Sequence, residues 1–340
     1  MAHGVIHATT GLKMERIAGL FWNRNERRLR AGWRVFMQAM LWLFVPALLS
    51  GLLGAPLGSL LTALAPVLAP VSGRAANFTL TLLGALGGTW LATRFLDRRD
   101  FRDLGLHFSR VWWIDFAFGL GLGALLMTLI FAVEWLMGWI DVTGAFEVAD
   151  GTPFLVAILG PVIVFIVVGI TEELLARGYE IKNLAEGFNG RFLTPAQAVV
   201  AAWLLSSVFF GLLHMFNPNA TWYSTLSLMV AGVFLGTGFV LTGSLAIPIG
   251  LHITWNFFQG NVFGFPVSGN DFTTVTFIAI RQGGPDLWTG GPFGPEAGLL
   301  GIVAMVLGSL LTVAWIQRRH GDIRIDTALA RYRPRRRTNK

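Results

Sequence analysis

The chain has 340 residues, of which 54% are hydrophobic and only 13% charged, with a formal net charge of +7 and no cysteine. So few charges exclude an ordinary soluble domain, in which about a quarter of the residues are charged. The lack of cysteine excludes disulfides, thiol catalysis and cysteine metal ligands.

The N-terminal segment 1–32 is basic and lacks the apolar core and small-residue cleavage site of a signal peptide. Ile17, Leu20 and Phe21 follow a helical spacing beside several arginines, which is typical of a segment on a membrane surface. We expect this segment to lie in the cytoplasm or at the interface, and the first membrane helix to be retained as an anchor.

Eight long apolar stretches predict an all-α fold, a polytopic transmembrane helical bundle that occupies residues 33–317. The apolar stretch 57–71 is interrupted by prolines and is expected to form an interfacial or re-entrant connection. The glycine- and proline-rich segment 264–296 is expected to be a loop outside the cell. The expected spans are 33–53, 77–95, 113–138, 154–174, 195–215, 223–242, 245–263 and 297–317.

The basic residues predict the orientation of this bundle. Of the 26 lysines and arginines, 24 fall in the N-terminal segment (counting Arg34 at the start of the first span), in loops 94–112 and 175–194 and in the C-terminal tail 318–340, which leaves Arg74 and Arg281 for the other side. The positive-inside rule then puts both termini in the cytoplasm, with the chain in the inner (plasma) membrane. The basic tail is expected to contact anionic lipids rather than nucleic acid.

Ionisable side chains inside apolar spans are costly and are therefore functional candidates. Glu172, Glu173, His214 and His252 are of this kind. Glu173 and Arg177 are four residues apart on one helix face and can form an ion pair. Glu172 is rotated by about 100° and lacks that partner, which suits a general base. The alternative is a simple ion pair at the interfacial end of a helix.

The histidines each have a neighbour one helical turn away. Phe210 precedes His214, and Asn256 follows His252. His252 and Asn256 can donate hydrogen bonds to one point, as a developing oxyanion requires. The simpler interpretations are a polar residue where a helix meets water for His214, and helix–helix hydrogen bonding for His252 with Asn256.

Helix lengths predict that these groups can meet. If the helix of Glu173 continues to about Glu186, it descends roughly 20 Å, and Pro195 to His214 climbs back about 28 Å. We therefore expect a wet cavity in the cytoplasmic half of the membrane, open to the cytoplasm.

Three motifs in this order resemble the CPBP family, which comprises type II CAAX prenyl endopeptidases and bacteriocin-processing or self-immunity (Abi) proteins. The likeness continues through Gly178 and through segments 214–219 and 290–299, covers roughly residues 80–317 and is centred on 150–265. The motifs are Glu172-Glu173-xxx-Arg177, Phe210-xxx-His214 and His252-xxx-Asn256.

The resemblance implies an intramembrane endopeptidase that acts on a membrane-associated peptide or protein. By motif position, Glu172 and His214 would activate water, while His252 and Asn256 would stabilise the oxyanion. The supporting residues are then Glu173, Arg177 and Phe210.

Other functions stay open at this point. The expected enzyme needs no cofactor, but two glutamates and two histidines could hold a divalent metal such as zinc. Against this, the chain has no HExxH motif, and Arg177 adds positive charge. Some relatives act without proteolysis, so the chain could instead be a membrane scaffold or immunity protein that binds another membrane protein. A transporter is disfavoured because no inverted repeat is visible.

Overall fold

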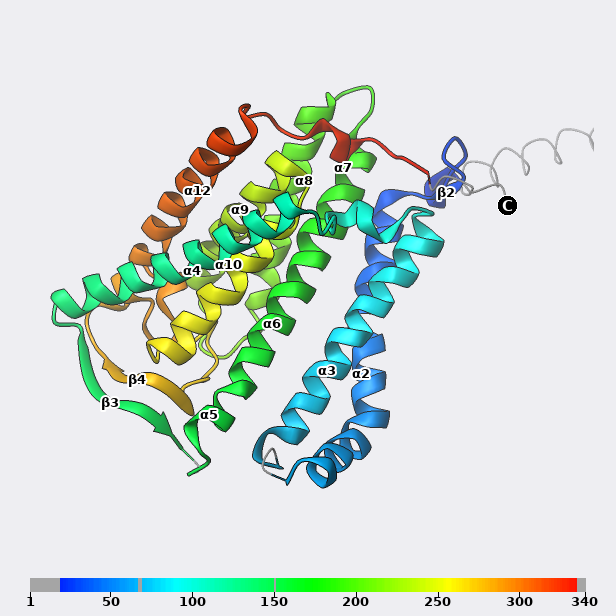
Figure 1. The fold of residues 1–340 in the computed structure, drawn as a ribbon. Coiled ribbons are helices and arrows are strands. Elements are labelled where there is room, and N and C mark those ends of the chain that lie inside the picture. Colours follow the sequence, from blue (N-terminus) through cyan, green and yellow to red (C-terminus); the bar gives the residue numbers. More distant parts are fainter. Residues whose placement is uncertain (1–18, 67–68, 150, 335–340) are drawn as a thin grey trace, which may run out of the picture.

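Apolar helices make up most of the computed structural model, which describes residues 19–66, 69–149 and 151–334. The long helices run between two ends of one bundle (Figure 1). The expected helical membrane bundle is therefore confirmed in its class. Its long helices are α2 (Ala31–Leu64), α3 (Ala69–Leu91), α4 (Arg110–Leu136), α6 (Leu159–Glu173), α8 (Pro195–His214), α9 (Trp222–Thr242), α10 (Ala246–Phe257) and α12 (Leu299–His320).

The predicted number of eight spans is not confirmed. The predicted spans 77–95 and 245–263 do form helices, α3 and α10, but α10 has only 12 residues before a π-helical turn, η5 (Phe258–Val262). Among the described residues, six helical segments are long and apolar enough to cross a membrane: Ala31–Leu64, Arg110–Leu136, Phe154–Phe188, Pro195–His214, Trp222–Thr242 and Leu299–Arg319.

Helix α2 corrects the expected connection at 57–71. Residues 57–64 continue α2 as regular helix despite Pro46 and Pro56 inside it, whereas 67–68 lie outside the described residues. The backbones of α2 and α3 approach closely, since a Cβ on Gly84 would lie 2.6 Å from the Cα of Pro46. Small residues permit such close helix packing in membranes, and packing compensates for the hydrogen bonds that proline removes.

The chain from α5 (Phe154–Ala157) to α7 (Lys182–Phe188) forms one helical rod. After Glu173 it passes through a π-helical segment, η4 (Leu174–Ile181), before α7. The predicted continuation to about Glu186 is thus confirmed. The next helix, α8, begins at a capping box in which the Thr194 side chain accepts from the backbone of Gln197.

Two strands form a feature that the all-α prediction missed. β3 (Ile140–Val148) pairs with β4 (Val275–Gln282) in an antiparallel ribbon with an irregularity between Val142 and Gly144. The ribbon lies at the end of the bundle opposite α7 (Figure 1). The expected loop 264–296 therefore contains a strand.

Short elements complete the described chain. They are β1 (Trp22–Asn23), β2 (Arg28–Leu29), η2 (Ala92–Leu96), η3 (Phe101–Leu104), α11 (Asp286–Thr289), η6 (Gly291–Phe293), η7 (Pro295–Ala297) and η8 (Thr327–Ala330).

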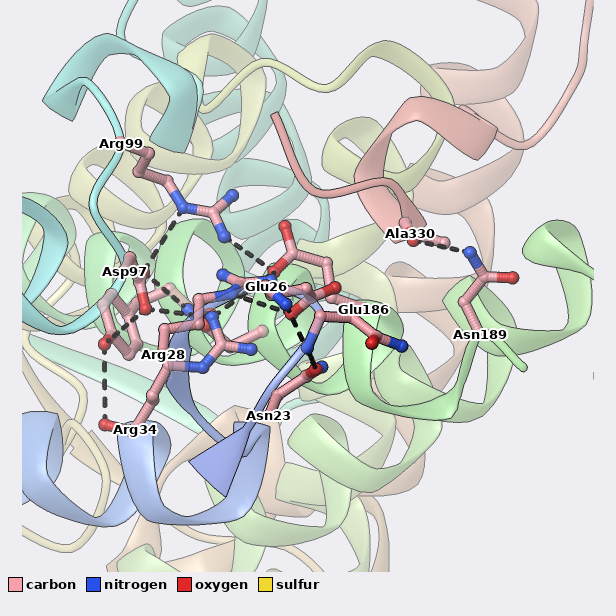
Figure 2. Close-up of polar contacts among 12 residues, drawn as sticks. Asn23, Glu26, Arg28, Arg34, Asp97, Arg99, Glu186, Asn189 and Ala330 are labelled. Carbon is pink, nitrogen blue, oxygen red and sulfur yellow. Dashed lines mark hydrogen bonds and ion pairs between the residues drawn. The ribbon is translucent and has the colours of Figure 1, made fainter. Parts of the chain in front are cut away.

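The basic segments gather at the α7 end of the bundle, where buried charges tie them together (Figure 2). Glu186 of α7 accepts from Arg28 at 2.7 Å and from Arg99 at 2.7 Å, and lies 3.4 Å from Arg34. Asp97 bonds Arg34 at 3.1 Å. We name Arg28, Arg34, Asp97, Arg99 and Glu186 the arginine cluster, and it joins the N-terminal arm, α2, the end of α3 and α7.

Candidate functional site

The second glutamate of the first motif sits at the junction of α6 and η4. Glu173 is 0% exposed, and its Oε1 accepts from Arg177 Nη1 at 3.0 Å and from His252 Nδ1 at 2.7 Å. Arg177 also donates to the Gly232 carbonyl at 3.2 Å. The predicted Glu173–Arg177 pair is present, and both side chains are buried inside the bundle.

Phe210 lies between the other motif side chains. The Arg177 guanidinium stacks over its ring at 4.5 Å, and the His214 ring centroid is 4.6 Å away. His252 meets the same ring edge-on at 6.4 Å. The Phe210 carbonyl is the partner of His214 Nδ1 at 2.7 Å. One aromatic residue therefore contacts all three motifs.

The four predicted catalytic side chains line one cavity of about 390 Å³: Glu172, His214, His252 and Asn256. Each of these side chains has polar atoms without a hydrogen-bond partner among the described residues. These atoms are the Glu172 carboxylate oxygens, the Asn256 amide and Nε2 of both histidines. Polar groups inside a protein are usually paired with other protein groups. Because these four side chains face one cavity and keep unpaired polar atoms, they can bind a substrate or water there.

The cavity lies near the middle of the helical rod. Glu172 is about 27 Å along the rod from Phe154 and about 24 Å from Phe188. Side chains from beyond α8 and η5 also line it, namely Asn217, Ser268 and Asn270. These loops approach from the end that carries β3 and β4. The expected opening toward the cytoplasm stays a prediction.

Several lining residues were not anticipated from the sequence. Trp42 comes from α2. Glu180 falls in the expected loop 175–194, yet it is buried and accepts from Ser206 at 3.2 Å. Glu180 is eight residues after Glu172, and positions eight apart share a helix face. Extending the helical pattern past Arg177 would have found it.

Glu296 organises the loop over the cavity. It is buried and accepts from the Ser268 hydroxyl at 3.2 Å and from the Gln259 amide. Its own carbonyl accepts from Ser227 at 2.6 Å. Burial raises the pKa of the Glu296 carboxyl to about 7, although the hydrogen bonds it accepts oppose this shift. The 290–299 stretch thus acts by holding Ser268 at the cavity wall.

A zinc site built from the motif glutamates and histidines does not fit this arrangement. Among the described residues, no three His, Asp or Glu side chains group as metal ligands. The Glu173 Oε1 atom is already bonded to Arg177 and His252, which leaves it poorly placed to coordinate a cation.

Comparison with known proteins identifies this region. Residues 154–258 match the family model described as type II CAAX prenyl endopeptidase Rce1-like, and the match includes all three motifs. This segment is therefore similar to the CAAX-protease family. The resemblance noted from the motifs is therefore confirmed for the helices that line the cavity.

One curated relative of this chain is the uncharacterized protein YyaK of Bacillus subtilis (strain 168). The two are 26% identical over 181 residues, which is 52% of this chain. The aligned region spans 56% of the relative's own length. No solved structure matches the chain.

Proposed function

We propose that the protein is an intramembrane endopeptidase that hydrolyses a peptide bond of a membrane-associated peptide or protein. One observation carries the proposal: one cavity between apolar helices is lined by four side chains that each have a polar atom without a partner among the described residues, namely Glu172, His214, His252 and Asn256. The family match adds the reaction class, since its description is that of a prenyl endopeptidase.

His214 suits the water-activating role. Its Nδ1 faces the Phe210 carbonyl, which can only accept, so Nδ1 carries the proton. In the neutral ring Nε2 then has a free lone pair that can accept from water. Together with the unpaired Glu172 carboxylate, this gives two acceptors for the protons of one water molecule.

His252 suits the opposite role. Its Nδ1 donates to the Glu173 carboxylate, so Nε2 becomes a donor only when the ring is doubly protonated. Glu173 holds the His252 ring by this contact, and the proposed role uses the doubly protonated ring. The Asn256 amide follows one turn later on the same wall of the cavity. These two donors would stabilise a developing oxyanion.

These roles give a hydrolysis of the peptide bond in three steps. The oxygen of water attacks the scissile carbonyl carbon while Glu172 takes a proton, with His214 orienting the water. The carbonyl oxygen becomes the oxyanion held by His252 and Asn256. The C–N bond then breaks, and the proton held by Glu172 leaves with the amine.

We also propose that the arginine-cluster end faces the cytoplasm, following the positive-inside rule. Because loops from the ribbon end supply Asn217 and Asn270, we propose that the cavity is reached from that end, which revises the cytoplasmic opening. The chain has no cysteine, so single cysteines report cleanly. In right-side-out vesicles, an impermeant maleimide should label Asn270→Cys and spare Arg324→Cys. The reverse pattern would restore the cytoplasmic opening.

The activity is tested with purified full-length protein and a library of membrane-anchored peptides, with and without chelator. We expect chelator-resistant cleavage that is lost in Glu172→Ala and retained in Glu147→Gln, a carboxylate exposed on β3. Chelator-sensitive cleavage would contradict the metal-independent mechanism. No cleavage, with the cellular phenotype surviving Glu172→Ala, would point to the scaffold or immunity alternative.

A further inference from the structure

A second pocket lies at the opposite end from the ribbon, between the start of α7, the η3 region and the C-terminal tail. It has a volume of about 160 Å³. Its charged lining comprises four cations and two carboxylates, which gives a net charge of +2 (4 − 2): Arg99, Lys182, Arg331, Arg333, Asp103 and Asp326. It shares no lining residue with the cavity of the motif residues.

Lys182 is the most informative residue of this pocket. It is the first residue of α7 and lines the pocket. Among the described residues, its ammonium group makes no hydrogen bond and no ion pair, and neither Asp103 nor Asp326 approaches it to ion-pair distance. Asp326 instead caps η8 by accepting from the Ala328 backbone at 2.9 Å. A half-buried lysine without a partner is unfavourable unless an anion compensates it.

The arginine cluster adjoins the pocket, since Arg99 also lines the pocket wall. Its three buried arginines are balanced by two buried carboxylates and by the half-buried Glu26, which pairs with Arg28 at 2.8 Å, so the excess positive charge of the pocket comes from Lys182 and the tail arginines (Figure 2). The side chains of Arg331 and Arg333 are exposed and can close over a ligand. Planar guanidinium groups next to an ammonium are the groups that proteins use to bind phosphate.

The surroundings favour a ligand at the membrane surface. His107 also lines the pocket, and the next residue, Phe108, is 54% exposed. Trp113, near the start of α4, is 53% exposed, and its ring lies 6.2 Å from that of Phe108. Exposed aromatic rings at the end of an apolar helix mark the headgroup level of a bilayer.

We propose that this pocket binds a phosphate-bearing anion, with an anionic phospholipid headgroup as the favoured source and a free phosphate compound as the other source. Lys182 and Arg99 form its fixed wall, and Arg331 and Arg333 of the tail complete it. The ligand thereby fastens the C-terminal tail to α7, the last part of the rod that carries Glu172. The proposal does not depend on proteolytic activity.

The test uses the full-length protein in neutral detergent, with retention of phosphatidylglycerol against phosphatidylcholine measured by native mass spectrometry. Lys182→Gln with Arg333→Gln should weaken phosphatidylglycerol retention by at least about tenfold, since two charge-assisted contacts are lost. The matched control, Arg324→Gln, removes a tail charge outside the pocket and should retain the lipid. Lys182→Arg should also retain it, which separates a lost site from a misfolded variant.

A second arm titrates inorganic phosphate and glycerol phosphate against the thermal unfolding of lipid-free protein. Stabilisation that disappears in the double variant supports the site with a free phosphate compound as its source. Equal phosphatidylglycerol retention by the wild type and the double variant, without phosphate stabilisation, would overturn the proposal. Equal losses in the double variant and in Arg324→Gln would also overturn it, since only general surface charge would then be at work.

Discussion

One helical rod carries carboxylates of two kinds, and their surroundings differ sharply. Glu186, in the arginine cluster, is within hydrogen-bond or ion-pair distance of three arginines. Glu172, four turns earlier, has no partner among the described residues and faces a cavity. The first arrangement compensates charge and fixes the packing of α7, whereas the second leaves a carboxylate free for chemistry.

Glu173 lies between these extremes. Its Oε1 is held by Arg177 and His252, while its buried Oε2 has no partner in the part of the chain that the structure describes. It is compensated like Glu186 but stands beside the cavity like Glu172. On this rod, the number of cations around a carboxylate therefore distinguishes Glu186, which fixes the packing of α7, from Glu172, which faces the cavity.

Replacing Glu186 or Glu172 by glutamine gives the largest expected effects. Glu186→Gln leaves three buried arginines short of a counter-charge and should cost about 3–5 kcal/mol of stability. Glu172→Gln should leave the thermal unfolding temperature unchanged but lower peptide cleavage roughly 10²–10⁴-fold. Both variants are measured by thermal unfolding in detergent and by the peptide assay. A Glu186→Gln protein as stable as the wild type would contradict the structural role of Glu186.

Glu296 is an intermediate case, because it is buried and hydrogen-bonded but has no ion-pair partner among the described residues. Its pKa is about 7 when folded, against 4.5 for the unperturbed group. The folded state therefore holds the proton more tightly, so stability is greatest below about pH 4.5 and falls as the pH rises through 7. The full loss is roughly 3 kcal/mol.

The measurement is the unfolding temperature between pH 5 and 8. Glu296→Gln should remove this pH slope and add a constant loss of about 1 kcal/mol, since an amide offers Ser268 and Gln259 one acceptor instead of two. Wild-type stability that rises over the same interval would mean that Glu296 is ionised and well compensated when folded.

The difference between these carboxylates was only partly readable from the sequence. The site residues were predictable because ionisable groups inside apolar spans stand out, and helical spacing pairs Glu173 with Arg177. The arginine cluster was not, since Arg28, Arg99 and Glu186 are far apart in the chain and look like ordinary cytoplasmic charges. Only the packing of α2, α3 and α7 brings them together.

Local pattern also misled in two places. Prolines suggested that α2 ends before residue 57, but close packing against α3 keeps the helix intact. The glycine-rich segment 264–296 hides β4, whose partner β3 lies more than 130 residues earlier, so no hairpin signal marks it. Long-range pairing of this kind has no local signature.

Arg177→Lys tests whether the geometry of the cation beside Glu173 matters when its charge is kept. Lysine keeps the positive charge but loses the fork that reaches both Glu173 and the Gly232 carbonyl, and it loses the flat stack on Phe210. We expect cleavage to fall about tenfold, with kcat more affected than KM, because Glu173 positions His252. Arg281→Lys, in an exposed pair with Asp141, is the matched control and should behave as wild type.

Phe210→Leu gives the smallest effect and the finest test. Leucine keeps apolar contact with Arg177 but removes the ring face, and a cation–π contact contributes about 1 kcal/mol. The His214 Nδ1 contact is to the backbone of residue 210, so it survives the substitution. We therefore expect cleavage to fall about fivefold with the His214 tautomer unchanged, measured by kinetics and by ¹⁵N NMR of the histidine rings. A loss as large as that of Glu172→Gln would show that the ring itself orders the site. The number of cations around Glu172 and Glu186 would then be insufficient to explain why one carboxylate takes part in the chemistry and the other fixes the packing.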